Sequence, residues 1–257
     1  MSKKTGPRIL LFDIETMAGL GWFWQRRETN ILSVKHDWYI ISFAYKWLGE
    51  KRTYVHALPD FPLYKQDKRN DKDLCKKLWE VLNGADIVIA HYGDAFDLKK
   101  SNARFICHGF DPVPPIKSVD TYKVSRRHFK FGSNKLDDVA KYFNLGAKHQ
   151  TGGWQLWLDC AENDIKSAWN KMKKYNKQDV ILLEKVYLKL RPYMNNHPNI
   201  GVLNGEGVCP KCGSRNIQYR GYAITSTCKY RRFQCLECSG WGKESTSIKQ
   251  DKTLRNT

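Results

Sequence analysis

Two acidic residues, Asp13 and Glu15, lie two positions apart within a short apolar segment, residues 8–16. Pro7 and Gly19 bound this segment, so it predicts a β-strand. Because side chains alternate across a strand, both carboxylates would face the same side. Two close carboxylates repel one another unless a cation lies between them, and oxygen ligands suit Mg²⁺ or Mn²⁺. The pair therefore predicts a divalent-metal site, and the alternative is a strand end where both acids meet solvent.

Two further places in the chain carry acids next to predicted elements. Asp97 follows an apolar strand, residues 86–90, and would begin the next helix, where the helix dipole alone could favour it. Tyr175 and Asp179 are four residues apart on a predicted helix, so they share one face. Each acid taken alone fits an ordinary solvated side chain, so only the combination points to a site.

In chain order the three places resemble the three motifs of the DEDD exonucleases, which have a ribonuclease H-like fold. The tyrosine four residues before the last acid is typical of the tyrosine subtype. The stretches between the motifs are similar to the exonuclease domains of family-B DNA polymerases and to YprB-like nucleases. The matching stretches are Phe12-Asp-Ile-Glu-Thr16, Phe96-Asp97, Val119-Asp-Thr-Tyr122, residues 134–143 and Tyr175-Asn-Lys-Gln-Asp179.

The resemblance, which extends over residues 8–191, implies a two-metal-ion 3′→5′ exonuclease that releases 5′-mononucleotides from single-stranded nucleic acid, DNA more than RNA. It implies that Asp13 bridges two Mg²⁺ or Mn²⁺ ions and that Glu15 and Asp179 complete the shell of the first. Asp97 would hold the second ion, and Tyr175 would orient the attacking water.

One position departs from the family-B pattern, which carries asparagine five residues before the second-motif aspartate. Here that position is Tyr92, which bears on how the strand is gripped. Two alternatives keep the fold but change the activity: a catalytically silent nucleic-acid-binding protein, and a structure-specific endonuclease. An aromatic group after the first motif, Trp22, Phe23 and Trp24, would either wedge the terminal base or pack in the core or a lid.

Two C-x-x-C pairs near the C-terminus, Cys209-Pro-Lys-Cys212 and Cys235-Leu-Glu-Cys238, are separated by 22 residues. This pattern resembles a zinc ribbon, in which four thiolates hold one structural Zn²⁺. So small a module would depend on the metal for much of its stability. It would serve as a structural cap, a protein-docking module or, as its basic and aromatic residues favour, a nucleic-acid contact. Those residues are Arg215, Arg220, Lys229, Arg231, Arg232 and Lys243, with Tyr219, Tyr222, Tyr230 and Trp241.

The elements that must position these residues alternate between strand and helix. Apolar runs predict strands over residues 39–47 and 52–57, joined by a hairpin, and helical spacing appears over residues 71–82 and 164–191. The sequence leaves two alternatives for the last helix: an uninterrupted helix, or one with a break between Lys174 and Asn176. The order predicts an α/β fold, a ribonuclease H-like mixed sheet flanked by helices. The expected units are residues 1–194 for the nuclease domain, 195–207 for a linker, 208–244 for the zinc ribbon and 245–257 for a polar tail.

The charge of the chain indicates its partner. Lys and Arg number 44 against 26 Asp and Glu, a net charge of +18, which favours nucleic acid before an anionic membrane surface. No run of about 18 apolar residues is present, so we expect no membrane span. We expect a location in the cytoplasm, or in the cytoplasm of the host for a viral protein. Residues 117–135 are either a strand-binding segment or a solvated basic loop whose aromatics anchor the core. The predicted nucleic-acid contacts are Lys123, Arg126, Arg127 and Lys130 there, and Arg231 and Arg232 in the ribbon.

Overall fold

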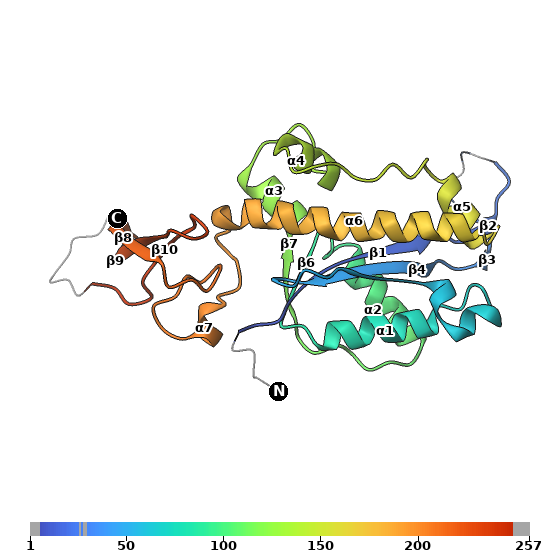
Figure 1. Ribbon diagram of the computed structural model, residues 1–257, viewed down its shortest axis with the longest axis horizontal. Coiled ribbons are helices and arrows are strands. Elements are labelled where there is room, and N and C mark those ends of the chain that lie inside the picture. The colour runs from blue at the N-terminus through green and yellow to red at the C-terminus, as the bar shows by residue number, and fades with distance from the viewer. Residues whose placement is uncertain (1–5, 26, 28–29, 249–257) are drawn as a thin grey trace.

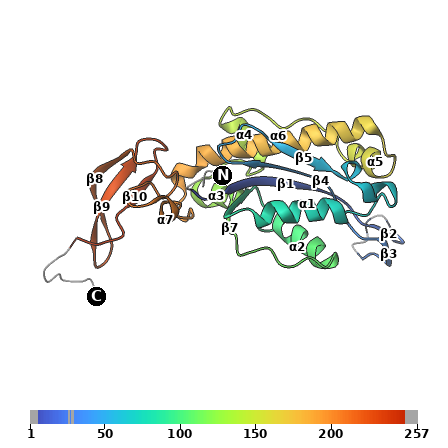
Figure 2. The ribbon, with the colours of Figure 1, turned by 60° about the horizontal axis from the view of Figure 1, so that its bottom comes forward.

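The computed structural model describes residues 6–25, 27 and 30–248. A five-stranded sheet with helices on both faces forms the body, and a small three-stranded sheet extends from one end of it (Figures 1 and 2). The strands of the body are β1 (Ile9–Met17), β2 (Leu20–Trp22), β3 (Ser33–His36), β4 (Tyr39–Trp47), β5 (Tyr54–Ala57), β6 (Ile87–Ala90) and β7 (Lys117–Asp120). Its helices are α1 (Lys72–Asn83), α2 (Asp97–Cys107), α3 (Thr121–His128), α4 (Leu136–Tyr142), α5 (Gln155–Ala161) and α6 (Lys166–Leu190).

The main sheet has the order β5-β4-β1-β6-β7. β1 runs antiparallel to β4 and parallel to β6, and β7 runs parallel to β6. The sheet is therefore mixed, and the predicted α/β fold of ribonuclease H-like type is confirmed. The pairing of β1 with β4 shifts register between Glu15 and Thr16. Such irregularities recur beside active sites because they re-aim the neighbouring side chains.

Two apolar layers pack on opposite faces of β1. Leu10, Phe12 and Ile14 belong to the cluster beneath α1 and α2, whereas Ile9 and Leu11 belong to the cluster beneath α6. Figure 1 shows α1 and α2 on one side of the sheet and α6 along the other. β1 is therefore buried on both faces, as a central strand of an α/β sheet should be.

Helix α6 runs from Lys166 to Leu190 without interruption, so the alternative of a break between Lys174 and Asn176 is wrong. The reason lies in the side chain of Asn176, which is buried and bonds to groups on β1 and β4. An exposed asparagine can compete for the hydrogen bonds of the helix backbone. Here the side chain is bonded to Ser42 and Asp13 instead, so the helix continues.

Residues 117–135 are not a loop throughout. They form β7, α3 and an irregular segment, and Phe129 and Phe131 pack against the core cluster beneath α6. The alternative in which these aromatics anchor the core is thus confirmed for the two phenylalanines. The predicted hairpin between residues 39–47 and 52–57 is present as β4 and β5.

The C-terminal sheet has the order β10-β9-β8, and we call residues 208–244 the four-cysteine module. The predicted linker, residues 195–207, contains a short helix near its end, and the limits of the predicted domains stay predictions. Part of the predicted polar tail, residues 249–257, lies outside the described residues. Within the described chain, no helix is both long enough and apolar enough to cross a membrane. The elements of this part are α7 (Gly201–Asn204), β8 (Ile217–Ile224), β9 (Lys229–Cys235) and β10 (Trp241–Lys243).

Candidate active site and metal centre

Three carboxylates meet between β1 and α6. Asp13 and Glu15 continue the row of β1 side chains that starts with Ile9 and Leu11 and faces α6. Oxygen atoms of Asp13, Glu15 and Asp179 all lie within 4.8 Å of one another. The structure thus brings together residues that are more than 160 positions apart in the chain.

The fourth acid, Asp97, lies beside this group at the first residue of α2. Its side chain is buried, and its Oδ1 accepts a hydrogen bond from the backbone N–H of Ile14 at 3.0 Å. Asp97 is close enough to Asp13 to raise its pKa by repulsion, but it is not one of the three acids that share the 4.8 Å cluster. This arrangement fits a group of three ligands with a fourth acid at its edge.

Lys148, which the sequence analysis missed, supplies a cation to the cluster. Its Nζ donates to Oδ2 of Asp179 at 2.5 Å and to the hydroxyl oxygen of Tyr175 at 3.3 Å. It lies in the segment between α4 and α5, where no periodic pattern marks one lysine among the many of this basic chain. Only the folded path of that segment distinguishes it.

Asn176 is the second residue that the sequence analysis missed. Its amide nitrogen donates to Oδ2 of Asp13 at 2.7 Å, and its amide oxygen accepts from the hydroxyl of Ser42 at 2.9 Å. Asn176 is fully buried. It therefore fixes the carboxylate of Asp13 and connects α6 to β1 and β4 at the same point.

Burial and mutual repulsion make this a site of high carboxylate pKa. Burial raises the pKa of Glu15 to about 8, with repulsion from Asp179 acting in the same direction. Burial likewise raises the pKa of Asp97 to about 7 and raises that of Asp13 well above its ordinary value, to which Asp97 and Glu15 add. Lys148 opposes these shifts. A group of acids with such shifted pKa values is typical of a functional site.

The donor set fits a divalent cation. Oδ1 of Asp179 is buried, and among the described residues it has no hydrogen-bond partner. Carboxylate oxygens of Asp13 and Glu15 lie within 4.8 Å of a carboxylate oxygen of Asp179, and hard oxygen ligands of this kind suit Mg²⁺ or Mn²⁺. A bound cation would satisfy the unpaired oxygen and relieve the repulsion at once.

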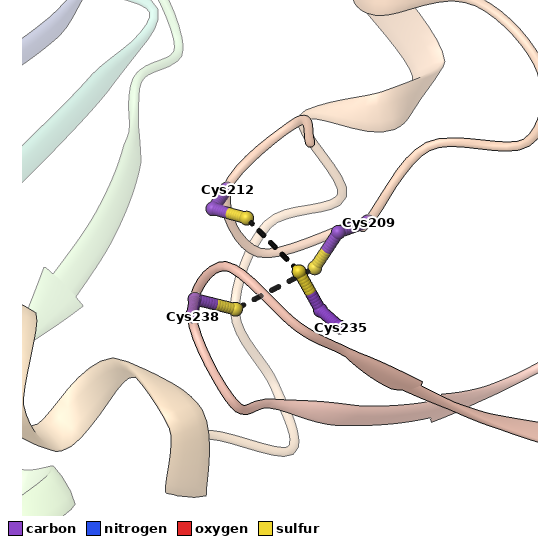
Figure 3. A group of neighbouring side chains, drawn as sticks. All are labelled: Cys209, Cys212, Cys235 and Cys238. Carbon is purple, nitrogen blue, oxygen red and sulfur yellow. Dashed lines mark hydrogen bonds between the residues drawn. The ribbon is translucent and has the colours of Figure 1, made fainter. Parts of the chain in front are cut away.

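The four cysteines of the C-terminal module converge on one point (Figure 3). The sulfur atoms of Cys209 and Cys238 are 3.7 Å apart, and those of Cys212 and Cys235 are 3.6 Å apart. Four sulfurs at about 2.3 Å from a tetrahedral Zn²⁺ would be about 3.8 Å from one another. The cluster therefore fits a structural zinc site, with each short pair formed between the two C-x-x-C segments.

A third group of potential ligands, Asp71, Cys75 and His108, is an ion-pair cluster. Arg104 donates to Asp71 with its Nε at 2.8 Å and also with its Nη2. The guanidinium already neutralises the aspartate, and a metal ion beside it would be repelled. Burial raises the pKa of the Cys75 thiol, so this sulfur stays protonated.

The predicted contacts on α3 and just after it are exposed to solvent. Lys123 forms an ion pair with Asp94 at 2.6 Å, so its positive charge is partly neutralised. Arg126, Arg127 and Lys130 are exposed as well. These side chains remain available to a ligand, and their contact with nucleic acid stays a prediction.

The predicted contacts of the module lie on its strands next to aromatic rings. The guanidinium carbon of Arg231 is 4.0 Å from the centre of the Tyr219 ring, and that of Arg232 is 5.0 Å from Trp241. Both arginines are exposed. Cations above exposed rings form a surface that can offer both charge and stacking.

The aromatic group after β1 does not pack in the core, so that alternative is wrong. Trp22, Phe23 and Trp24 are 63%, 55% and 81% exposed. They follow the strand that carries the first motif, on or beside the short hairpin of β2 and β3. Large aromatic side chains this exposed mark a surface available for contacts.

A family model described as the RNase_H superfamily matches residues 27–191, more than half of the chain. The chain belongs to the RNase_H superfamily. Strand β1, with Asp13 and Glu15, precedes the matched residues. No curated protein matches this RNase_H-superfamily chain.

Among solved structures, the fold is similar to that of the family B DNA polymerase from the hyperthermophilic archaeon Pyrobaculum calidifontis. The two share 16% sequence identity, with a TM-score of 0.52. The similarity covers 73% of this chain but only 25% of the polymerase chain, so the chain corresponds to about a quarter of that protein.

Removing one of the clustered charges should stabilise the metal-free protein. The carboxyl of Glu15 keeps its proton up to about pH 8 when folded, against an ordinary pKa of 4.5. The folded state therefore loses stability as the pH rises between these values. Glu15→Gln should raise the Tm in EDTA by about 2–4 °C at pH 8.5, and by less at pH 5. Differential scanning fluorimetry at both pH values measures this, and a lower Tm for the variant at pH 8.5 would contradict the repulsion.

Loss of one clustered thiol should unfold the four-cysteine module alone. Cys235→Ser should reduce zinc from one ion per chain to nearly none, and should make residues 208–244 sensitive to protease while the body stays folded. Metal analysis and limited proteolysis measure the two effects. Cys228→Ser is the matched control because its sulfur lies outside the cluster. Full zinc content in Cys235→Ser would reject this ligand set.

Proposed function

We propose that this chain is a metal-dependent 3′→5′ exonuclease that acts on single-stranded nucleic acid, DNA in preference to RNA, and releases 5′-mononucleotides. The observation that carries the proposal is the group of Asp13, Glu15 and Asp179, whose oxygens lie within 4.8 Å of one another on a ribonuclease H-like fold. Asp97 at the edge of this group and Tyr175 one helical turn before Asp179 complete the set of the tyrosine subtype.

The acids would hold two divalent ions, Mg²⁺ or Mn²⁺. In this proposal Asp13 would help to hold both ions, Glu15 and Asp179 would hold one of them, and Asp97 would hold the other. Bound there, the ions would supply an activated water and stabilise the charge that develops on the phosphate and on the leaving oxygen.

The protein's own groups would position the reactants. Asn176 keeps the Asp13 carboxylate in place through its 2.7 Å hydrogen bond. Burial raises the pKa of the Tyr175 hydroxyl, so it stays protonated and orients the attacking water as a donor rather than removing a proton. Lys148, 3.3 Å from that hydroxyl, would place a positive charge beside the scissile phosphate.

A silent binding protein of the same fold is the second candidate, and one observation favours it. The ammonium group of Lys148 is bonded to Asp179 inside the carboxylate group, where it neutralises part of the charge that would attract a metal. In a protein without catalysis such a contact would be permanent. In the proposed enzyme Asp179 would exchange this ammonium partner for a metal ion.

The exposed basic surfaces support nucleic acid as the partner. In this proposal α3 contributes Lys123, Arg126 and Arg127, with Lys130 just beyond it. The four-cysteine module, taken as a zinc ribbon, contributes Arg231 and Arg232 together with their aromatic neighbours. A protein that docks on the module is the alternative occupant of this surface.

The activity is tested with 5′-labelled single-stranded DNA and RNA of equal sequence, in Mn²⁺ or in EDTA. We expect a metal-dependent ladder that shortens from the 3′ end, faster on DNA, and no cutting of circular single strands. Asp13→Ala and Asp179→Ala should each lower the rate at least about a hundredfold, because several kcal/mol of charge stabilisation are lost. Both variants should keep the circular dichroism spectrum of the wild type.

The outcomes separate the candidate functions. Cutting of circular DNA would indicate an endonuclease. Bound but intact substrate under every metal condition would indicate the silent binding protein. Full activity in either purified aspartate variant would reject the metal assignment.

Neutralising the arginines of the module should weaken binding in a salt-dependent way. Arg231→Ala with Arg232→Ala should lower the slope of log K against log salt by about 1.4 for a single strand, since each phosphate contact accounts for about 0.7. Fluorescence anisotropy across a salt series measures this. The charge-matched control is Lys72→Ala with Lys76→Ala. Both lysines are exposed on α1, which lies on the face of the sheet opposite α6. An unchanged slope in the arginine variant would contradict nucleic-acid contact by the module and would favour a protein as its partner.

A further inference from the structure

Tyr92 is an exposed tyrosine in a conformation that tyrosine rarely adopts. Its backbone φ is +68°, in the left-handed region that favours glycine, and its side chain is 49% exposed. It stands five residues before Asp97, at the position where the family-B pattern has asparagine. Strained backbone of this kind is retained at functional sites when the surroundings hold it in place.

The group that holds Tyr92 is the buried carboxylate of Asp120. Its Oδ1 accepts the backbone N–H of Tyr92 and that of Tyr122, both at 2.9 Å. Its Oδ2 accepts the backbone N–H of Asp94 at 3.3 Å. One buried side chain therefore fixes the two tyrosine-bearing segments relative to each other, although they come from different parts of the chain.

The two rings form a small platform beside a group of cations. The Tyr92 and Tyr122 rings are 5.0 Å apart at 78°, an edge-to-face pair. The ring of Tyr92 is half exposed, whereas the ring of Tyr122 also contacts His91 at 5.8 Å and lies 5.9 Å from the guanidinium of Arg126. Together they border an open depression of about 490 Å³, which lies within the range of small-molecule sites, roughly 300–1,000 Å³. The residues that line it are Tyr92, Tyr122, Lys123, Arg126 and Arg127.

The charge of this depression selects its ligand. Among the residues that the structure describes, no acidic side chain lines it, and of its cations only Lys123 has an acidic partner, Asp94. Within the described residues, neither Arg126 nor Arg127 forms an ion pair. Aromatic faces beside unpaired guanidinium groups suit a ligand that combines a flat ring with a phosphate, which is a nucleotide of a single strand.

The backbone that carries Tyr92 lies next to Asp97, the acid at the edge of the carboxylate group. The carbonyl of Tyr92 accepts the N–H groups of Ala95 and Phe96, so a single turn of chain connects Tyr92 to Asp97. A Cβ atom on the intervening Gly93 would lie 3.7 Å from Oδ2 of Asp97. A strand whose end reaches the carboxylates would therefore pass the platform within a nucleotide or two.

A second, smaller depression continues from the platform toward the four-cysteine module. It shares Lys123 and Arg127 with the first and is also bordered by Met194, Asn196 and His197, which follow α6. Asp94 and Asp120 border it too, and both carboxylates are already bonded, Asp94 to Lys123 and Asp120 to backbone N–H groups. Figures 1 and 2 place α3 at the end of the body from which the module extends. The two depressions together favour a polymeric strand over a free nucleotide.

We propose that Tyr92 and Tyr122 form a subsite that stacks one unpaired nucleobase close to the 3′ end, while Arg126 and Arg127 contact its phosphate. This inference rests on the proposed function for the position of the strand. It assigns Tyr92 the grip on the strand that another residue type provides in the family-B pattern.

The test combines a variant with a matched change in the ligand. Glycine adopts a φ of +68° without strain, so Tyr92→Gly should keep or raise the Tm while it weakens binding of a single-stranded 12-mer about five- to a hundredfold. Tyr92→Phe, which keeps the ring, should bind as the wild type does. A scan with one abasic nucleotide at each position should reveal one position where loss of the base weakens wild-type binding but not that of Tyr92→Gly. Fluorescence anisotropy in EDTA measures binding without cleavage.

The control is Tyr142→Ala, which removes another exposed ring, on α4, and should leave binding unchanged. Equal effects of the abasic nucleotide on the wild type and Tyr92→Gly at every position would overturn the subsite. So would weakened binding in Tyr92→Phe. Cleavage is measured separately. If the protein shows this coupling in binding but never cuts, the subsite is supported and the proposed exonuclease activity is rejected. If it cuts but shows no coupling, the exonuclease activity is supported and the subsite is rejected.

Discussion

Repulsion between buried carboxylates is the constraint on which the arrangement of this protein depends. Asp13, Glu15 and Asp179 share a space of less than 5 Å, with Asp97 at its edge. Such a group is expensive in a folded chain, and here it is tolerated because β1 and β4, α6 and the segment that carries Lys148 all contribute compensation. Asn176 and the N–H of Ile14 each bind one carboxylate, and the ammonium of Lys148 neutralises another. These contacts hold the carboxylates together between β1 and α6.

The parts of the fold that follow from periodicity could be predicted from the sequence, whereas those that depend on tertiary partners could not. β1, β4 and α6 have apolar patterns set by burial, so their positions and the shared face of Asp13 and Glu15 were accessible. Helix α3 is short and strongly basic, and it is fixed by Asp120 as its N-terminal cap rather than by an apolar stripe. Lys148 has no local signal at all, because its role arises only when the segment after α4 returns to α6.

The four-cysteine module has its own small centre and a specific connection to the body. Its core is formed by the cysteines with Ile217, which is little apolar surface for three strands. Lys211, between the first two cysteines, is almost buried, and its ammonium group donates to the carbonyl of Pro192 just after α6. A charged side chain used in this way orients the module against the end of the helix. The loop that carries Cys209 and Cys212 is therefore bonded directly to the end of α6, the helix that carries Asp179.

The length of α6 therefore fixes the distance between the carboxylates and the end of the body to which the module is attached. Asp179 and Leu190 are separated by 11 residues of one uninterrupted helix, a distance of about 16 Å. At about 3.4 Å per stacked nucleotide this corresponds to roughly five nucleotides. In the proposed enzyme, a strand must be longer than this to reach both the carboxylates and the module, and a fragment of two or three nucleotides is too short to do so. The length of α6 would thus set the substrate length below which the proposed contacts to the module are lost.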